Sequence, residues 1–139
     1  MINGIHDEII LAARLLLAAL FLVFGWRKLT DLSGTFNQMV HEGLHLPGLA
    51  TAVSTFMELP VAFAVAIGAC TRPAALLMAL YTVGTAFIGH HFWTVKAADR
   101  VDSMDGFFKD LSIVGGFLLL FITGAGKYSV DALLGIAAP

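Results

Sequence analysis

The chain has 139 residues, of which 58% are hydrophobic and 13% are charged, with a formal net charge of −2. An ordinary soluble domain carries about 25% charged residues, so this composition indicates a membrane protein. The small net charge and the scattered basic residues argue against a nucleic-acid partner, and a lone cysteine, Cys70, excludes an intrachain disulfide, a Cys-x-x-Cys pair and a cysteine-based metal cage.

Four apolar stretches dominate the sequence, at about residues 9–26, 50–69, 73–92 and 107–125. A spanning helix needs about 20 mostly apolar residues, and in lipid only helices or closed barrels satisfy every backbone polar group. No stretch alternates with the period of a strand, so we predict an all-α fold: an integral membrane four-helix bundle forming one domain over residues 1–139. The first stretch lacks the basic start of a signal peptide and is expected to be retained.

The first span contains Arg14 and ends in Arg27-Lys28. At about 100° per residue, Arg14, Gly25 and Lys28 share one helical face, which we expect to face the bundle interior. Snorkelling of these basic side chains to the lipid headgroups is the alternative. The next segment, residues 31–48, is too polar to span but repeats apolar residues at helical spacing, and it predicts a short interfacial amphipathic helix between spans one and two.

The second span carries Glu58 and Pro60 near its middle, where a charge is most costly and a proline can kink the helix. One interpretation is a structural lock, in which the Glu58 carboxylate pairs with Arg14 or Lys109 or stays protonated. The other is a proton-accepting or ligand-binding carboxylate at a cavity between the spans. Both interpretations can hold together.

The third span follows a tight turn, so spans two and three are expected to be antiparallel neighbours. It ends in His90-His91-Phe92-Trp93, where Trp93 suits the membrane interface. Residues 94–106 are charged enough to predict a hydrated loop before the fourth span. At the end of the chain, Ser129 or Asp131 is expected to cap a last short turn.

The histidines of the chain do not form a convincing metal-binding site, although some are spaced as metal ligands can be. His90 and His91 are adjacent and point about 100° apart on a helix. His41 and His45 are four residues apart, but Gly43 weakens the helix between them and no carboxylate cluster accompanies them. We therefore expect no metal site, and the missing ligand pattern also argues against a haem.

Basic residues near the span ends predict the orientation, because cytoplasmic connections are enriched in Lys and Arg. The connections after spans one and three hold five such residues, and the opposite side holds two, or three if Arg14 is counted there. The five are Arg27, Lys28, Lys96, Arg100 and Lys109, and the two are Arg72 and Lys127. Both termini are thus expected outside.

Several short segments occur in a recognisable order along nearly the whole chain. They are Arg14, Phe24–Leu29, Glu58, Gly68, Thr71-Arg72-Pro73, His90-x-Phe92-Trp93, Phe108-Lys109-x-Leu111, Gly115-Gly116 and Gly124-x-Gly126-x-x-Ser129-x-Asp131. Together they resemble the DoxX/DoxD family of small four-helix bacterial inner-membrane proteins. Asp110 is one departure, since the family often shows an amide after the lysine.

The resemblance implies a multi-pass bacterial inner-membrane protein with a fold similar to that of vitamin K epoxide reductase relatives, whose redox cysteines this chain lacks. Some family members are the membrane subunit of a thiosulfate:quinone oxidoreductase or accompany redox enzymes, and many have no assigned activity. We therefore expect an integral membrane subunit of a quinone-linked redox system, which binds a quinone or similar apolar ligand within the bundle. Its expected partners are the lipid bilayer and a redox protein or a second copy of the chain.

The expected site consists of ionisable and aromatic residues in or beside the spans: Glu58, His90, Trp93, Arg14, Lys28 and Lys109. In this interpretation the acid handles protons, the histidine and tryptophan donate to a carbonyl and stack on the ring, and the basic residues tune the acid or hold an anionic group. A bound quinone, a haem or a partner protein must carry the electrons. Two alternatives stay open: a non-enzymatic scaffold or assembly protein, and a small proton-coupled transporter that uses the acid.

Overall fold

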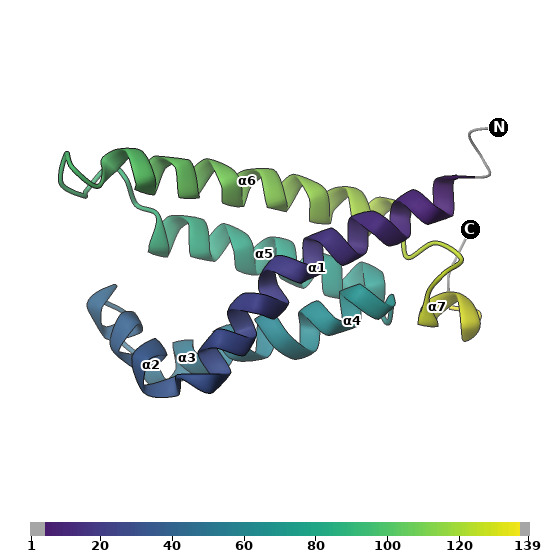
Figure 1. Cartoon of the computed structure of the whole chain (residues 1–139), viewed down its shortest axis with the longest axis horizontal. Coiled ribbons are helices and arrows are strands. Elements are labelled where there is room, and N and C mark those ends of the chain that lie inside the picture. The colour runs from purple at the N-terminus through teal and green to yellow at the C-terminus, as the bar shows by residue number, and fades with distance from the viewer. Residues whose placement is uncertain (1–4, 137–139) are drawn as a thin grey trace.

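The computed structural model describes residues 5–136, and this part of the chain is helical without strands (Figure 1). Four helices are long and apolar enough to cross a membrane: α1 (His6–Thr30), the continuous helix Pro47–Ile67, α5 (Thr71–Gly89) and α6 (Arg100–Thr123). They confirm the predicted all-α membrane bundle. A short α7 (Val130–Leu133) follows the last span.

The hydrated loop predicted for residues 94–106 is wrong in its second half, because α6 begins at Arg100. Asp102 lies in the first turn of α6, where a negative charge favours the positive end of the helix dipole. Charged residues outside lipid do not oppose a helix, so α6 continues beyond its apolar part. The connection between α5 and α6 is correspondingly shorter than predicted.

The second span is one continuous helix with a change of winding in its middle. It consists of α3 (Pro47–Phe56), the π-helical turn η2 (Met57–Val61) and α4 (Ala62–Ile67). Pro60 lies inside η2 and lacks the N–H that a regular α-helix would use. The disturbance predicted at the proline therefore takes the form of a π-helical turn, a feature frequent at functional sites, and Glu58 lies within it.

The segment between spans one and two contains α2 (Leu32–His41), as predicted. The Asp31 side chain caps it by accepting a hydrogen bond from the Gly34 amide at 3.0 Å. α2 exposes Leu32, Phe36 and Val40, which recur every four residues and so share one helical face. This face fits the interfacial position expected for the helix.

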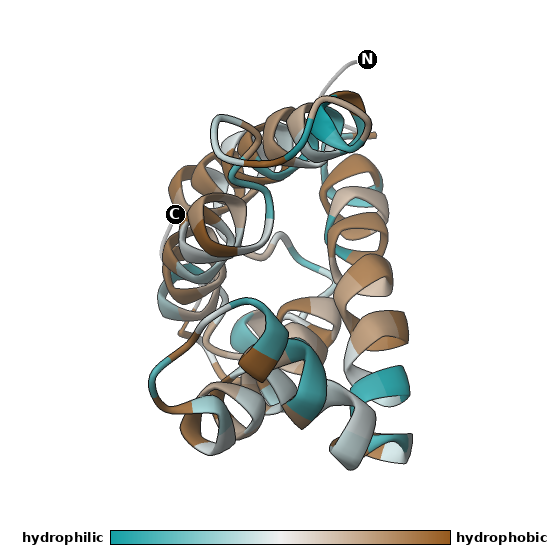
Figure 2. Cartoon of the chain, turned by 90° about the vertical axis from the view of Figure 1, so that its left-hand side faces the viewer, coloured by the Kyte–Doolittle hydropathy of each residue, from teal (hydrophilic) through white to brown (hydrophobic). Residues whose placement is uncertain are grey.

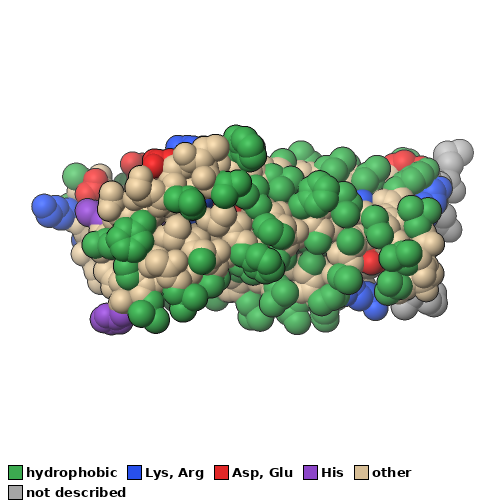
Figure 3. Space-filling view, turned by 90° about the horizontal axis from the view of Figure 1, so that it is seen from below, with side chains coloured by type: hydrophobic (Ala, Val, Ile, Leu, Met, Phe, Trp, Pro, Cys, Tyr) green, Lys and Arg blue, Asp and Glu red, His purple; other side chains and the backbone are tan. Residues whose placement is uncertain are grey.

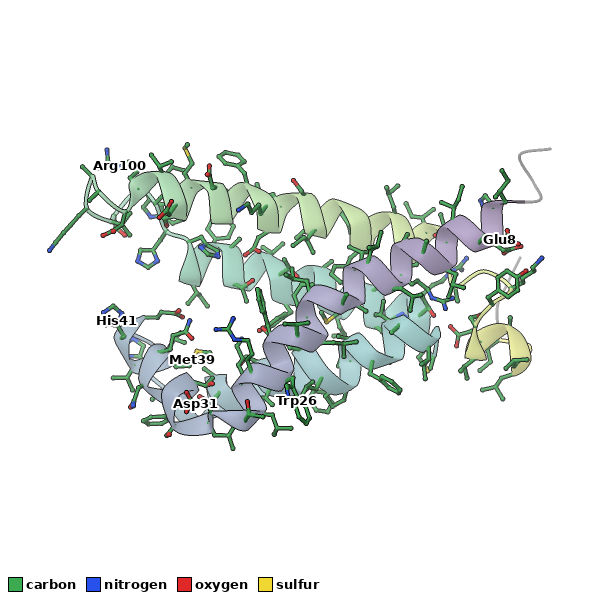
Figure 4. The ribbon with its side chains drawn as sticks, viewed as in Figure 1. Glu8, Trp26, Asp31, Met39, His41 and Arg100 are labelled. Atoms are coloured by element: carbon green, nitrogen blue, oxygen red, sulfur yellow. The ribbon has the colours of Figure 1, made fainter. Side chains whose placement is uncertain are left out.

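The helices run along one long axis with distinct ends (Figure 1). The start of α1, the turn between α4 and α5, and α7 lie at one end, and α2 and the α5–α6 connection lie at the other. Glu8 marks the first end, while His41 and Arg100 mark the second (Figure 4). On the face seen in Figure 3, Lys, Arg, Asp, Glu and His side chains lie toward the two ends, and the middle is apolar, as the surface of a membrane-spanning protein requires.

Seen from the end that carries α2, the ribbon along the spanning helices is mostly hydrophobic (Figure 2). The core itself combines Phe21, Met78 and Phe117 with many alanines. Small residues let helices approach closely in lipid. One close approach of two spanning helices lies at Gly25 of α1, where a Cβ atom would be 2.8 Å from the Glu58 backbone.

Candidate ligand-binding cavity

Glu58 is held in the interior by two hydrogen-bond donors from different helices. Its Oε1 accepts from the Lys28 ammonium of α1 at 2.6 Å and from the Tyr81 hydroxyl of α5 at 2.6 Å. The Glu58 residue is 4% exposed, and within residues 5–136 no donor reaches its Oε2. The predicted pairing of this carboxylate with Arg14 or Lys109 is therefore wrong, because the end of α1 brings Lys28 to it instead.

A cavity of about 970 Å³ opens beside this group of side chains. Its apolar walls include Leu20, Phe21, Phe24, Met39, Val53 and Ile88, from α1, α2, α3 and α5. Pockets of roughly 300–1,000 Å³ that combine apolar walls with a few polar groups are typical of small-molecule sites. Glu58, Lys28 and Tyr81 all line this cavity.

A second polar group lines the same cavity and is centred on α6. Asp110 Oδ2 accepts from the Thr85 hydroxyl at 3.2 Å and lies 3.9 Å from His90 Nε2. Because Tyr81 and Thr85 are one turn apart on α5, this helix holds the two acids, Glu58 and Asp110, on neighbouring turns. His90 is thus brought to the cavity as the sequence suggested.

Sequence reasoning missed Tyr81 and Asp110. Within the third span, Thr82 and Ala86 are fully buried. Tyr81 and Thr85 lie on the adjoining face, which lines the cavity. The departure of Asp110 from the family pattern was the one signal that pointed to this position.

Arg14 lies at the other end of the bundle, away from the cavity. It is 1% exposed, and its guanidinium donates to the backbone carbonyls of Ala125, Ala66 at 3.1 Å and Tyr128 at 2.8 Å. These carbonyls belong to the end of α4 and to the segment that follows α6. Arg14 therefore joins the first span to the C-terminal segment.

Asp131 completes this end of the structure. Its carboxylate accepts from the amides of Cys70 at 2.7 Å and Thr71 at 2.8 Å, at the start of α5, while Ser129 caps α7 through the Ala132 amide. Burial raises the pKa of Asp131, but the hydrogen bonds to Thr71 and Cys70 and the Arg14 charge outweigh it, so this pKa lies below its ordinary value. Of the two predicted caps, Ser129 caps the last turn and Asp131 caps α5.

Trp93 and Lys109 also lie outside the cavity lining. Trp93 is 51% exposed and packs edge-on against Phe92 and Phe107 in an aromatic cluster beside the α5–α6 connection, a typical membrane-interface position. Lys109 is exposed on α6. The structure thus brings Glu58, Lys28 and His90 together and separates the other three predicted residues from them.

The fold and its cavity define a class: a multi-pass membrane protein in which four spanning helices surround buried acid and base side chains. The DoxX family model matches residues 9–91, and the chain belongs to this family. Inner membrane protein YphA of Escherichia coli K12 is 41% identical over 123 residues, 88% of each chain. Inner membrane protein YqjF of the same organism is 40% identical over 130 residues, 94% of this chain and 95% of its own.

No solved structure matches the chain. The resemblance drawn from the sequence motifs is confirmed by the family match and by both relatives. Together with the four spans, they make the chain a multi-pass inner-membrane protein.

Proposed function

We propose that the cavity binds a quinone or a similar apolar ring compound, and that the chain is the membrane subunit of a quinone-linked redox system. The observation that carries this proposal is the buried Glu58, held by Lys28 and Tyr81 at the edge of a cavity of about 970 Å³. A hydrophobic ring with polar oxygens matches a site with apolar walls and a few ionisable groups.

Different lining residues are suited to contact different parts of such a ring. Lys28 keeps N–H groups beyond the one given to Glu58, and His90 lies on the same cavity, so both are placed to donate to a ring carbonyl. Glu58 is the group suited to exchange protons with the ligand. Trp93 is outside the lining, so ring contacts fall to Phe24 and Tyr81.

The chain itself supplies no electron carrier. Cys70 is a single exposed thiol, and ordinary side chains do not carry electrons at accessible potentials. The proposal therefore includes a redox partner protein that exchanges electrons with the bound ring. The role of the chain is to hold the ring in the membrane and to supply protons to it.

Quinone extraction tests the proposal. The full chain is purified in mild detergent, its lipids are extracted, and quinone is quantified per mole of protein for the wild type, Glu58→Gln and His90→Ala. The same substitutions at exposed positions, Glu8→Gln and His45→Ala, serve as matched controls. We expect quinone with the wild type and the controls and a loss of several-fold in the cavity variants. Wild-type protein that carries no quinone, and that is not labelled at the cavity by a photoreactive quinone, would contradict the proposal.

A scaffold role is the second candidate, and the contacts of Arg14 favour it. Arg14 is a buried charged residue whose hydrogen bonds hold separate segments of the bundle together. If the Glu58–Lys28 pair does the same, Glu58→Gln changes stability and the recovery of partner proteins but not ligand content. The extraction experiment, repeated with a thermal melt of each variant, separates the two roles.

A further inference from the structure

We infer that the cavity prefers the reduced, hydroxyl-bearing form of its ring ligand: a para-hydroquinone rather than the corresponding quinone. This inference rests on the proposed function and specifies the chemical class that the same site takes. It follows from two acids on the cavity walls whose capacity to accept hydrogen bonds is partly unused, because hydroxyl groups donate hydrogen bonds and quinone carbonyls only accept them.

The first acceptor is Glu58. Both of its donors, Lys28 Nζ and Tyr81 Oη, bind the same oxygen, Oε1. Oε2 is buried and has no donor within residues 5–136. A buried carboxylate oxygen without a donor is costly, so this oxygen has unused capacity to accept a hydrogen bond. Glu58 lines the cavity, so a hydroxyl group of a ligand bound there can supply the missing donor.

The second acceptor is Asp110. Its Oδ2 has one donor, the Thr85 hydroxyl at 3.2 Å, and the 3.9 Å separation from His90 Nε2 is too long for a hydrogen bond. A carboxylate has room for about four donors, so most of its acceptor capacity is unused. Asp110 also lines the cavity, at the wall formed by α6.

The two acids are bound by side chains on neighbouring turns of one helix. Tyr81 binds Glu58 and Thr85 binds Asp110, and residues four apart on α5 have Cβ atoms about 6 Å apart. A hydroquinone carries two hydroxyl groups and can therefore donate one to each acid.

The overall charge of the lining agrees with a donor ligand. The acids in the lining are Glu58, Asp110, Asp31 and Glu42, and the fixed cations are Lys28 and Arg27. The other titratable side chains in the lining are His90 and Tyr81. The lining thus carries more acids than fixed cations. An anionic ligand would be repelled, whereas a neutral ligand that donates hydrogen bonds is accommodated.

A matched ligand series tests the inference without any substitution. The wild-type chain in lipid nanodiscs is titrated anaerobically with a tritiated hydroquinone carrying a decyl chain, its monomethyl and dimethyl ethers, and the corresponding quinone, with empty nanodiscs subtracted. We expect the hydroquinone to bind about 10- to 100-fold more tightly than the dimethyl ether, with the monomethyl ether between them, because each ether removes one charge-assisted hydrogen bond. The quinone is expected to bind more weakly than the hydroquinone.

Substitutions then assign the two hydroxyl contacts. Glu58→Gln and Asp110→Asn should each remove part of the preference for the hydroquinone over its dimethyl ether. Glu8→Gln and Asp102→Asn make the same chemical changes at exposed positions and should leave the preference intact. Far-UV circular dichroism checks that each variant is folded.

The outcomes separate this inference from the proposed function. If the quinone binds as tightly as the hydroquinone, or if the dimethyl ether does, the preference for the reduced form is wrong and the cavity still binds the ring. If no member of the series binds above empty nanodiscs, the proposed function fails and the inference fails with it.

Discussion

Gly25→Ala is expected to force apart the first span and the π-helical turn that holds Glu58. A Cβ atom on residue 25 would lie 2.8 Å from the Glu58 carbonyl carbon and oxygen and 2.8 Å from the Leu59 side chain. Carbon atoms pack best at about 3.5–4.0 Å, so the two helices must separate by several tenths of an ångström. Overpacking costs about 1–3 kcal/mol, and the better helix propensity of alanine returns up to about 1 kcal/mol. The expected net loss is about 1–2 kcal/mol.

The free energy of unfolding is measured by titrating the purified chain in mixed micelles with sodium dodecyl sulfate and following far-UV circular dichroism. Gly115→Ala is the matched control, since a Cβ atom at this position of α6 has no neighbour within 4 Å. The control should gain about 0.5–1 kcal/mol from helix propensity alone. If Gly25→Ala is as stable as Gly115→Ala, the close packing at Gly25 is refuted.

Four further predictions concern other parts of the molecule. Arg14→Met should cost about 2–6 kcal/mol in the same titration, because it leaves two or three buried carbonyls without donors, and unchanged stability would contradict its locking role. Lys28→Met should cost about 3–5 kcal/mol by leaving a buried carboxylate unpaired, whereas Lys109→Met on the exposed face should cost less than about 0.5 kcal/mol. The Asp131 pKa is depressed in the fold, so its stabilising contribution is complete above the ordinary value of 3.8 and is lost as the pH falls through the lower folded value. Thermal melts should show this loss in the wild type and not in Asp131→Asn. If both termini are outside, a membrane-impermeant maleimide labels the exposed thiol of Cys70 in intact spheroplasts; labelling only after permeabilisation would reverse the orientation.

The spans and the family could be read from the sequence because lipid imposes long apolar runs, and α2 could be read from its polar and apolar repeat. The start of α6 at Arg100 could not, since hydropathy marks where lipid ends and not where a helix ends. The contacts of Arg14 could not be predicted from the sequence either. Its acceptors are backbone carbonyls of Ala66 and Tyr128, 52 and 114 residues further along the chain, and carbonyls leave no side-chain signature.

The cavity was predicted in part. Glu58 was visible because a carboxylate within an apolar span is costly and rare. Lys28 was assigned to its face correctly, but its pairing depends on how α1 crosses η2, which a single helix does not specify. Tyr81 was missed because the face that α5 turns to the cavity is decided by the packing of α5 against α6.

The contacts of the Arg14 guanidinium have a consequence for biosynthesis. Two of its three carbonyl partners, Ala125 and Tyr128, leave the ribosome only after all four hydrophobic segments have been made. Until then the nascent protein holds an incompletely satisfied cation among its first-inserted helices. The first span therefore reaches its final packing in the bilayer only after the segment that follows α6 has been synthesised.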